Sequence, residues 1–599
     1  MRAFHKLTTQ RALKYPKQLL FVDTETTTIS DDDDSHEPSL RVGVAQYVRL
    51  NNDLSHAEIV EHVFKKVPHF WGFLTDLCNR TTDLTVFAHN WSFDFPVLNG
   101  FNTMMSLGYE LRGIVDASPP VIIRYQRAQS RVTFIDSLNY FQQSLKSMGM
   151  VLGKHKIGIN LTTSDIDELT TYCRQDVEIV RDSIINLMRF LHTNDLTRLT
   201  HTVSSLALST FVRRFMKTEI FIDGDEARNK LCRKSYFGGR TECFRIGKYK
   251  GPFYLIDINS QYPFVMRNND YPTKTFARHT RINTNDLESV IGRYCLTLKC
   301  DVNTHIPCLP YKIDGRTCFP VGRFTTVLST PEIEYALDNG LIVKTHELVL
   351  HYRARIFEDY VDHFYNLRNQ YRDAGNTMYA ELAKKLLNTL YGKFGQQLNK
   401  WEETNEPPRG YPGKWFVFDG ETRKRVYMME IGGKIYRSVS EEESRDSYPA
   451  IAAHVTAHGR IMLQRTIDYI GREHCYYCDT DSLLIDQSGY ESMKDRLNPR
   501  VLGCWSLDGE YNQIEIRGPK DYTFGSKQRI KGVRPKHVLV RDGLYRQLQF
   551  STLRGSIRRG EITTSVIRHV EKRLKRTYKK GNVDHNGVVS PFTVGDDTT

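Results

Sequence analysis

The amino-acid sequence predicts an α/β protein built from several domains. Its 599 residues are enough for about four units of roughly 150 residues each. Hydrophobic residues make up 40% of the chain, so large cores can form and wholesale disorder is excluded. In the first third, short apolar runs alternate with a helical pattern, which indicates an α/β domain over residues 1–195.

Three strands and a long helix are expected in this first domain. Apolar runs over residues 18–23, 84–88 and 132–136 indicate the strands, and apolar spacing over residues 165–191 indicates the helix. Asp23 and Glu25 are two apart at the end of the first strand, so their side chains share a face. Asp94 follows the second strand, and Tyr172 and Asp176 are four apart on one face of the helix.

Four carboxylates and a phenol at one place are typical of a divalent-cation site. Clustered carboxylates repel one another and need a cation between them, and oxygen ligands suit Mg²⁺. Two such ions can stabilise the attacking and leaving oxygens of a phosphodiester, with Tyr172 orienting the attacking water. Taken singly, each acid is more often a surface residue. Together, in the order D-x-E, N-x3-D and Y-x3-D, they predict phosphodiester hydrolysis.

The remaining chain alternates β-rich and helical stretches. In order, we expect a glycine-containing connector at 235–240, a strand at 253–257, a mostly β segment at 272–350, helices at 356–398 with a break near residue 373, a polar hairpin at 399–447, a helix at 449–470 and an acidic hairpin at 477–485. Residues 545–580 carry eleven Lys or Arg against two acids, a pattern that favours contact with duplex phosphates over a merely solvated tail.

The acidic hairpin predicts a second cation site. Asp479 and Asp481 are two apart and can point to the same side of the flanking strands. Asp257 ends another strand far earlier in the chain and supplies a third carboxylate. A plain acidic turn is the alternative, since Asp and Thr are common in turns.

The helix between these acids carries residues that suit a nucleotide. Lys384, Asn388 and Tyr391 follow i, i+4, i+7 spacing and therefore share one face. Such spacing usually marks a helix packed on a core, but Lys and Asn on the same stripe as an aromatic ring would make a poor core. A cation for phosphates, an amide, and a ring for a base or sugar fit a nucleotide instead.

These motifs resemble those of family B DNA polymerases. The resemblance rests on D-x-x-S-x-Y-P at 257–263, K-x3-N-T-x-Y-G at 384–392 and Y-x-D-T-D-S at 477–482, in that order. The N-terminal acids resemble a DEDD-type 3′–5′ exonuclease. Within the family, the chain is similar to the protein-primed polymerases of small phages and linear plasmids. Tyr236-Phe-Gly238-Gly239 matches their Y-x-G-G connector, and Lys520-Asp-Tyr522 matches their K-x-Y motif.

The resemblance implies an RNase H-like 3′–5′ exonuclease domain followed by a right-hand polymerase with two subgroup inserts. The expected division is exonuclease 1–195, palm 196–271 and 448–530, first insert 272–355, fingers 356–395, second insert 396–447, and thumb with a basic tail 531–599. By resemblance, the first insert contacts a priming protein, and the second encloses DNA and aids strand displacement and processivity.

The resemblance also implies roles for individual residues of the polymerase. Asp257, Asp481 and the Ile258 carbonyl would hold the metals, with Asp479 in support. The incoming nucleotide would meet Tyr262 under the sugar, Lys384 at the triphosphate with Arg372 as second candidate, and Tyr391 beside the nascent base pair, with Asn388 in the same nucleotide site. Lys520 and Tyr522 would grip the primer end. Gln261 and Thr389 stand where the subgroup often has Leu and Ser, and neither change should stop the chemistry.

In the exonuclease, the resemblance implies metal ligands at Asp23, Glu25, Asp94 and Asp176. The single-stranded 3′ end would be bound by Thr26, His89, Asn90, Phe93, Ser137 and Leu138. A lysine of the family site has two possible counterparts, Lys154 and Lys156, between which the sequence does not choose.

Charge and composition suggest the partners and the setting. Lys and Arg number 83 against 70 Asp and Glu, a net charge of +13 that favours a polyanionic partner. We expect DNA template and primer, dNTPs, a terminal priming protein acting in trans, and two Mg²⁺ per active site, with Mn²⁺ as a possible substitute. Eleven irregularly spaced cysteines predict a reducing compartment, and without a run of 18 or more apolar residues no membrane span is expected. We also expect a monomer. A host cytoplasm is favoured over an organelle.

Three other functions are alternatives to this expectation. A family B polymerase that starts without a protein primer would carry the same motifs, although the inserts weigh against it. A nuclease whose C-terminal part only binds DNA would not need Asp257, Asp481 and Lys384. A non-catalytic scaffold would not need two complete sets of acids.

Overall fold

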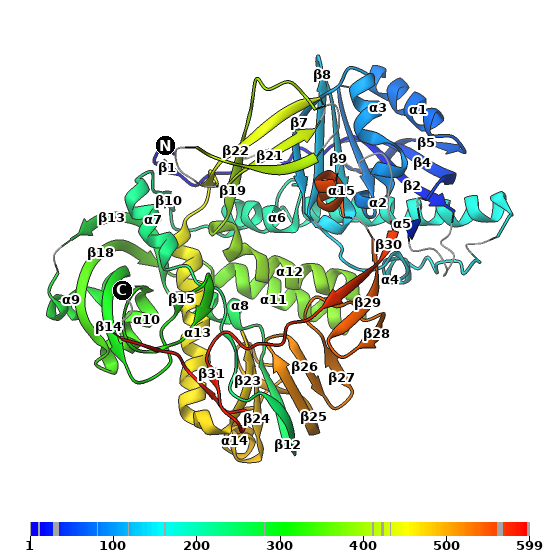
Figure 1. Ribbon diagram of the computed structural model, residues 1–599. Helices are drawn as coiled ribbons and strands as arrows, with labels where there is room; N and C mark the ends of the chain where they lie inside the picture. The colour runs from blue at the N-terminus through cyan, green and yellow to red at the C-terminus, as the bar shows by residue number, and fades with distance from the viewer. Residues whose placement is uncertain are drawn as a thin grey trace.

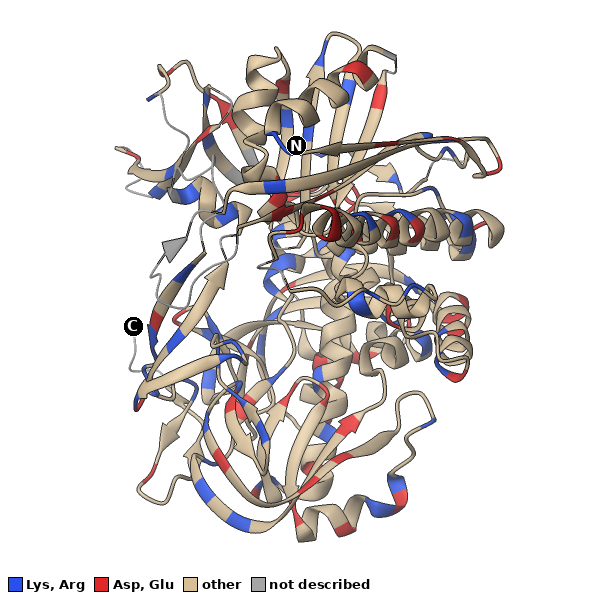
Figure 2. Cartoon of the chain, turned by 90° about the vertical axis from the view of Figure 1, so that its right-hand side faces the viewer, with Lys and Arg blue, Asp and Glu red and all other residues tan. Residues whose placement is uncertain are grey.

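The computed structural model describes residues 2–595 except for 10–11, 28–34, 37, 81, 118, 161–162, 281, 410–412, 421–424, 432, 551 and 560–566. Figure 1 shows the N-terminal domain as one body at the upper right, above a central sheet, with a further sheet at the left. In Figure 2, acidic and basic residues are interspersed over the elements of both halves.

The N-terminal domain is built on a seven-stranded sheet of order β5-β4-β2-β6-β9-β8-β7. The strands are β2 (Gln18–Thr26), β4 (Leu40–Leu50), β5 (His56–Phe64), β6 (Asp83–Ala88), β7 (Glu110–Asp116), β8 (Val121–Arg127) and β9 (Ser130–Asp136). The neighbours β2, β6 and β9 run parallel, which brings the ends of all three expected strands to one edge.

Helices cover both faces of this sheet. They are α1 (Val67–Arg80), α2 (Trp91–Val97) and α3 (Gly100–Ser106) on one side and α4 (Leu145–Val151) and α5 (Ile166–Thr193) on the other. Leu19 and Phe21 of β2 face the α5 core, whereas Leu20 and Val22 face the α1 core. The alternation follows from the two-residue period of a strand and explains why β2 reads as a continuous apolar run.

The central sheet holds seven antiparallel strands in the order β11-β23-β24-β12-β25-β26-β27. They are β11 (Thr241–Cys243), β12 (Gly247–Ile258), β23 (Cys475–Asp479), β24 (Ser482–Asp486), β25 (Trp505–Gly518), β26 (Asp521–Phe524) and β27 (Lys527–Arg529). Helix α13 (Pro449–Ile470) packs Leu463 and Ile467 against Ile256 and Ile258 on one face of the sheet. The long helix therefore supports the strands that end in Asp257 and Asp479.

A second sheet of five strands, in the order β13-β18-β14-β17-β33, forms at 271–354. Its strands are β13 (Tyr271–His279), β14 (Cys295–Thr304), β17 (Val321–Ser329) and β18 (Ile342–Ala354), with β33 (Thr593–Val594) added from the chain's far end. The helices α9 (Thr284–Ile291) and α10 (Thr330–Asp338) and the hairpin β15 (Tyr311–Ile313) and β16 (Arg316–Cys318) complete it. The segment is mostly β, as the sequence predicts.

Two antiparallel helices and a four-stranded hairpin sheet follow. The helices are α11 (Glu358–Asp373) and α12 (Thr377–Phe394), and they separate at Gly375, where φ is 71°. The hairpin sheet has the order β19-β22-β21-β20, from β19 (Gln397–Glu403), β20 (Gly413–Phe418), β21 (Arg425–Ile431) and β22 (Lys434–Glu443). Both match the helix break and the polar hairpin that the sequence indicates.

The last part of the chain packs against the N-terminal domain and does not form a separate C-terminal domain. Strands β28 (His537–Arg541), β29 (Leu544–Phe550) and β30 (Ile567–Arg573) form a sheet with β3 (Ser35–His36) of the N-terminal domain. Helix α15 (Leu553–Arg559) buries Leu553 and Ile557 in the N-terminal core. After β30, the strands β31 (Asn582–Val583), β32 (Val589–Ser590) and β33 lead back along the central sheet. The expected thumb and tail, 531–599, therefore divide into two differently placed pieces.

Ion pairs to a buried carboxylate connect these parts. Asp116 of β7 is 8% exposed and pairs with Lys414 of β20 at 2.5 Å and Arg554 of α15 at 3.3 Å. The N-terminal domain, the hairpin sheet and the last sheet thus meet at one carboxylate.

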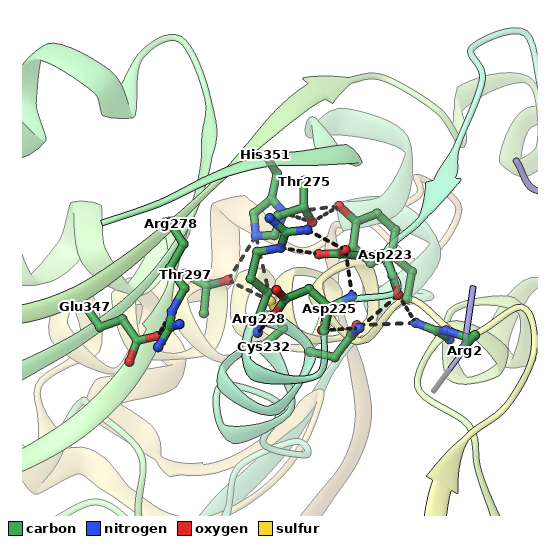
Figure 3. A network of polar contacts seen from close by, with 12 residues as sticks. Arg2, Asp223, Asp225, Arg228, Cys232, Thr275, Arg278, Thr297, Glu347 and His351 are labelled. Atoms are coloured by element: carbon green, nitrogen blue, oxygen red, sulfur yellow. Dashed lines mark hydrogen bonds and ion pairs between the residues drawn. The ribbon is translucent and has the colours of Figure 1, made fainter. Parts of the chain in front are cut away.

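A second junction lies between α7 (Glu226–Lys234) and the five-stranded sheet (Figure 3). The Arg2 guanidinium donates to the Asp223 carbonyl at 2.7 Å, and Arg228 donates to the Asp223 carboxylate at 2.7 Å. His351 lies in the same region, with Nδ1 2.9 Å from the Thr275 hydroxyl.

No described helix is long and apolar enough to cross a membrane.

Candidate active sites

The first cluster of acids forms where β2, α2 and α5 meet. The Thr24 hydroxyl donates to Asp94 Oδ1 at 2.6 Å, which joins β2 to α2. The Cys173 thiol of α5 donates to Asp23 Oδ2 at 3.4 Å, which joins β2 to the helix. Ligand atoms of Asp23, Glu25 and Cys173 all lie within 4.8 Å of one another. The structure therefore brings together the acids that the sequence places on separate elements.

Burial and mutual repulsion raise the pKa values of these carboxyls. Burial, then Asp94, Asp176 and Glu25, raise the pKa of Asp23 well above its ordinary value. The pKa of Glu25 is raised to about 8 by burial and Asp176, and that of Asp94 to about 7 by burial. Asp176 is 4% exposed, its pKa is also raised by burial, and its Oδ1 has no partner among the described atoms. These carboxylates offer oxygen ligands and have too little positive charge beside them, so the site fits divalent metal ions.

The structure distinguishes the two lysines. Lys156 Nζ lies 2.7 Å from Asp176 Oδ2 and 4.4 Å from the centre of the Tyr172 ring. Lys154 instead pairs with Glu178 and Asp182, both at 2.8 Å. Lys156 is therefore the cation at the acid cluster.

Asp136 is a site residue that sequence reasoning missed. Its buried carboxylate accepts hydrogen bonds from the backbone N–H groups of Asn90, Trp91 and Leu138, each at 2.9 Å. It thereby holds the turn that starts α2 and carries Asp94. Its position at the end of a parallel strand, like Asp23, was the available signal.

The predicted contacts for a single strand divide into exposed and buried groups. Thr26, Asn90, Phe93 and Leu138 are partly exposed at the rim. Ser137 is 0% exposed, and its hydroxyl lies 2.7 Å from His89 Nδ1. Ser137 lies behind His89 and supports it, and its contact with DNA stays a prediction.

The second set of acids lies at the tip of the central sheet. Asp257 of β12 stands opposite Ser482 of β24, and the Ile258 N–H donates to the Asp481 carbonyl at 2.8 Å. Thr480, with φ of 67°, makes the tight turn between the other two acids. Burial, then Asp481, raises the pKa of Asp257 to about 7. Burial, then Asp479, raises that of Asp481.

Asp479 differs from these two because the protein neutralises it. Its Oδ1 accepts from the Thr241 hydroxyl at 2.9 Å and lies 3.5 Å from Lys520 Nζ. Asp257 and Asp481 are left as the pair that needs a cation. This supports the predicted division into two metal ligands and a supporting neighbour.

Glycines in the connector permit a close approach to the acidic turn. A Cβ on Gly239 would lie 2.6 Å from side-chain atoms of Thr480, so a larger residue would displace the turn. The Arg240 carbonyl accepts from the Thr480 N–H at 2.7 Å. Gly238 faces open space, and Tyr236 packs closely over Gly395 at the end of α12. The Y-x-G-G connector thus ties the acidic turn to the helix that carries the nucleotide motif.

A family model described as DNA polymerase type B, organellar and viral, matches residues 159–463, just over half of the chain. The chain belongs to this family.

Named relatives and one solved structure agree with the family. A probable DNA polymerase of Neurospora intermedia is 24% identical over 375 residues, 59% of this chain but 37% of that protein. The chain therefore spans little more than a third of the Neurospora protein's length. The DNA-directed DNA polymerase of Enterobacteria phage PRD1 is 23% identical over 433 residues, 67% of this chain and 73% of the phage protein.

Phi29 DNA polymerase, in a complex with primer-template DNA and incoming nucleotides, has a TM-score of 0.68 at 15% identity. The match covers 94% of this chain and 100% of that one. At this identity the likeness establishes the fold, which is an exonuclease domain followed by palm, fingers and thumb. The predicted fold class is confirmed, and the region names are used from here on.

The helices α11 and α12, which correspond to the expected fingers, carry the predicted nucleotide residues. Lys384 of α12 is 46% exposed, and its charge lowers the pKa values of both Asp257 and Asp481. Arg372 is 55% exposed and lies 3.9 Å from Asp373. Arg368, which sequence reasoning missed, donates to the Ser260 hydroxyl in the D-x-x-S motif at 2.9 Å. It is one turn of α11 from Arg372 and lies closer to the palm motif.

The aromatic residues of the motifs pack together between palm and fingers. The rings of Tyr262 and Tyr391 have centroids 4.8 Å apart. Gln261, at the position that departs from the family, donates to the Gly459 carbonyl at 3.1 Å and the Thr480 carbonyl at 3.2 Å. Tyr522 is 7% exposed and stacks on Phe524 with centroids 4.0 Å apart, so it mainly supports the Lys520 turn.

A cavity of about 1060 Å³ opens between the exonuclease domain and α12. Asn388, Thr389 and Tyr391 line it. Four further lining residues are cationic, and none of the described lining residues is acidic; these cations are Arg124, Arg198, Lys385 and Lys393. Burial lowers the pKa of Lys385 and of Lys393, and among the described residues neither forms an ion pair with an anionic partner. A polyanion in this cavity would supply that partner.

Proposed function

We propose that this protein is a DNA-directed DNA polymerase with 3′–5′ exonuclease activity. One observation carries the proposal. A single chain holds two separate sets of carboxylates with too little compensating positive charge, one beside the predicted single-strand contacts and the other beside the helix with the predicted nucleotide residues. Asp94 and Glu25 of the first set and Asp257 of the second all have pKa values raised to about 7 or 8.

In the synthesis site, Asp257, Asp481 and the Ile258 carbonyl would hold Mg²⁺. When bound, Mg²⁺ supplies positive charge that stabilises the phosphate oxygens as the 3′-hydroxyl joins the α-phosphate and pyrophosphate leaves. Lys384 and Arg368 would bind the triphosphate, because the charge of Lys384 acts on Asp257 and Asp481 and Arg368 contacts Ser260 of the palm motif. Lys520 would hold the primer end next to Asp479.

The remaining residues would select and position the substrates. Tyr262, packed on Tyr391, would lie under the sugar and exclude a 2′-hydroxyl by steric clash. The basic cavity beside Asn388 would take the unpaired template strand, because none of its described lining residues is acidic and Tyr391 offers a ring for stacking.

In the exonuclease, Asp23, Glu25, Asp94 and Asp176 would hold divalent ions. Tyr172, held against Lys156, would orient the water that attacks the terminal phosphodiester. The turn that Asp136 fixes would present Asn90 and Phe93 to the single strand.

Separate loss of the two activities tests this assignment. Asp481→Ala should abolish primer extension while leaving degradation of a single-stranded oligonucleotide intact, and Asp94→Ala should do the reverse. Survival of primer extension in Asp481→Ala would contradict the assignment of the synthesis site.

We further propose that the chain replicates a linear genome from a protein primer and displaces the non-template strand. The two inserts support this, since the five-stranded and hairpin sheets interrupt the palm and fingers where the protein-primed subgroup carries them. The protein would be incubated with labelled dATP, Mg²⁺ and candidate proteins encoded by the same genome. A labelled protein band is expected. Extension from nucleic-acid primers alone would instead favour a family B polymerase without protein priming.

A further inference from the structure

The chain's last described segment, residues 574–595, forms a strap that leaves the thumb, crosses the palm and reaches the first insert (Figure 1). At the thumb, the Leu574 N–H donates to the Gly543 carbonyl at 2.8 Å. On the palm, the Val589 N–H donates to the Phe244 carbonyl at 3.0 Å. At the insert, β33 pairs in parallel with β17, with Val321 opposite Thr593.

Two glycines fix the register of this strap. Gly322 has φ of 93°, and a Cβ there would lie 2.1 Å from the Val594 carbonyl oxygen. Gly587 has φ of 80°, and a Cβ there would lie 2.0 Å from the Ile246 carbonyl oxygen. Both positions need glycine for conformation and for space. The strap is therefore a specifically seated element of the fold and differs from a solvated basic tail.

Side chains of the strap cover the free edge of the palm sheet. Strand β11 is the edge strand, so its outward backbone groups lack a neighbouring strand. Tyr578 accepts from the Cys243 N–H at 3.1 Å, and Lys580 Nζ donates to the Thr241 carbonyl at 2.9 Å. The Tyr578 ring also packs on the cluster that contains Tyr477. The strap thus satisfies the backbone of β11 in place of another strand.

The covered strand supports an acid of the synthesis site. Thr241 stands opposite Asp479 in the register of β11 and β23, and its hydroxyl donates to Asp479 Oδ1 at 2.9 Å. The strap also reaches the primer motif. Arg576 pairs at 3.2 Å with Asp521, which is 5% exposed and follows Lys520 directly. The strap therefore contacts the backbone of Thr241 and the neighbour of Lys520, two residues whose side chains meet Asp479 Oδ1.

We propose that Arg576, Tyr578 and Lys580 are positioning residues for the synthesis site. They act through β11 and the primer motif and touch no reacting atom themselves. The described contacts of the strap lie on the thumb, palm and first insert, away from the exonuclease acids. The inference rests on the proposed function above and adds that the strap sets the position of the Asp479 hairpin. It predicts a defect in synthesis that leaves exonuclease unchanged.

The test compares Lys580→Met with two matched variants. Lys579→Met removes the same charge one residue away at an exposed position, and Lys580→Arg keeps a donor for the Thr241 carbonyl. Loss of one charged hydrogen bond should lower the rate of single-nucleotide addition about fivefold in Lys580→Met. Single-strand exonuclease should stay within about twofold of wild type, as for a surface change. Lys580→Arg and Lys579→Met should both synthesise at close to the wild-type rate.

A second measurement does not depend on activity. Amide hydrogen exchange over residues 475–485 should be faster in Lys580→Met than in Lys579→Met, because the edge strand beside them has lost its support. Equal exchange in the two variants would overturn the proposal, even if the protein proved not to synthesise DNA. Equal loss of synthesis in both Met variants, or a parallel fall in exonuclease, would also overturn it. If the wild-type protein does not synthesise DNA but the two Met variants still differ in hydrogen exchange, only the proposed function is refuted.

Discussion

Replacing Asp94 by Asn should stabilise the exonuclease domain while inactivating it. Asp94 is 2% exposed, and burial is the main cause that raises its pKa from 3.8 to about 7. A carboxyl whose pKa is higher in the folded state does not reduce the free energy of unfolding below about pH 4, where it is protonated in both states. The loss of stability grows as the pH rises from the pKa of the unfolded state to that of the folded state, and it is complete above about pH 7.

The size of the effect follows from that shift. About three pKa units correspond to about 4 kcal/mol, which is a ceiling because neighbouring acids share the same repulsion. Asn keeps an acceptor for the Thr24 hydroxyl, so the contact at 2.6 Å can survive the change. We therefore expect about half of the ceiling, a gain of about 2 kcal/mol in the free energy of unfolding of this domain at pH 8. For a domain of this size, that raises the midpoint by roughly 4–8 °C.

The assay is thermal unfolding in EDTA at pH 8 and at pH 5, followed by tryptophan fluorescence. Trp91 lies in the same helix as Asp94 and reports on this domain. Asp76→Asn, an exposed acid on α1, is the control and should change little. Adding Mg²⁺ should raise the wild-type midpoint more than that of Asp94→Asn. A variant no more stable than wild type at pH 8, or equally stabilised at both pH values, would refute the repulsion argument.

Three further predictions follow from named contacts. Lys156→Met should lower exonuclease kcat by roughly a hundredfold, the low end for a group that assists catalysis, and Lys154→Met should change it little, since Lys156 alone of the two contacts Asp176. Equal effects on single-strand degradation would contradict this. Arg368→Ala should raise the KM for dNTP about tenfold in steady-state primer extension, because the loss of one charged hydrogen bond costs about 1.4 kcal/mol. Arg372→Ala should raise this KM less than threefold. A larger effect of Arg372→Ala would instead identify Arg372 as the triphosphate contact. Asp116→Asn should shorten products made in a single binding event by several-fold, because it leaves two cations unpaired at the junction of exonuclease, second insert and thumb. If the length of these products and its dependence on salt were both unchanged, this junction would have no role in keeping the protein on DNA.

Local patterns in the sequence were enough for most of the fold and for the site motifs. Two-residue spacing placed Asp23 with Glu25, and four-residue spacing placed Tyr172 with Asp176, because strand and helix periods fix which side chains share a face. Runs of apolar residues located β2, β12 and α13 for the same reason. The residues missed were those whose role depends on a distant partner. Asp136, Cys173 and Arg368 belong to no spacing pattern, and each becomes part of a site through a contact with another element.

The sequence alone determined the two sets of acids, the nucleotide helix and the order of the domains, because these are properties of short segments and of their succession along the chain. Only the tertiary structure decided between Lys154 and Lys156, moved Ser137 behind His89, and added β3 to the thumb sheet. It alone showed that residues 574–595 return to cover the edge of the palm sheet. A strand edge accepts any backbone or side chain that can satisfy its hydrogen bonds, so no local pattern reveals which distant segment will cover it.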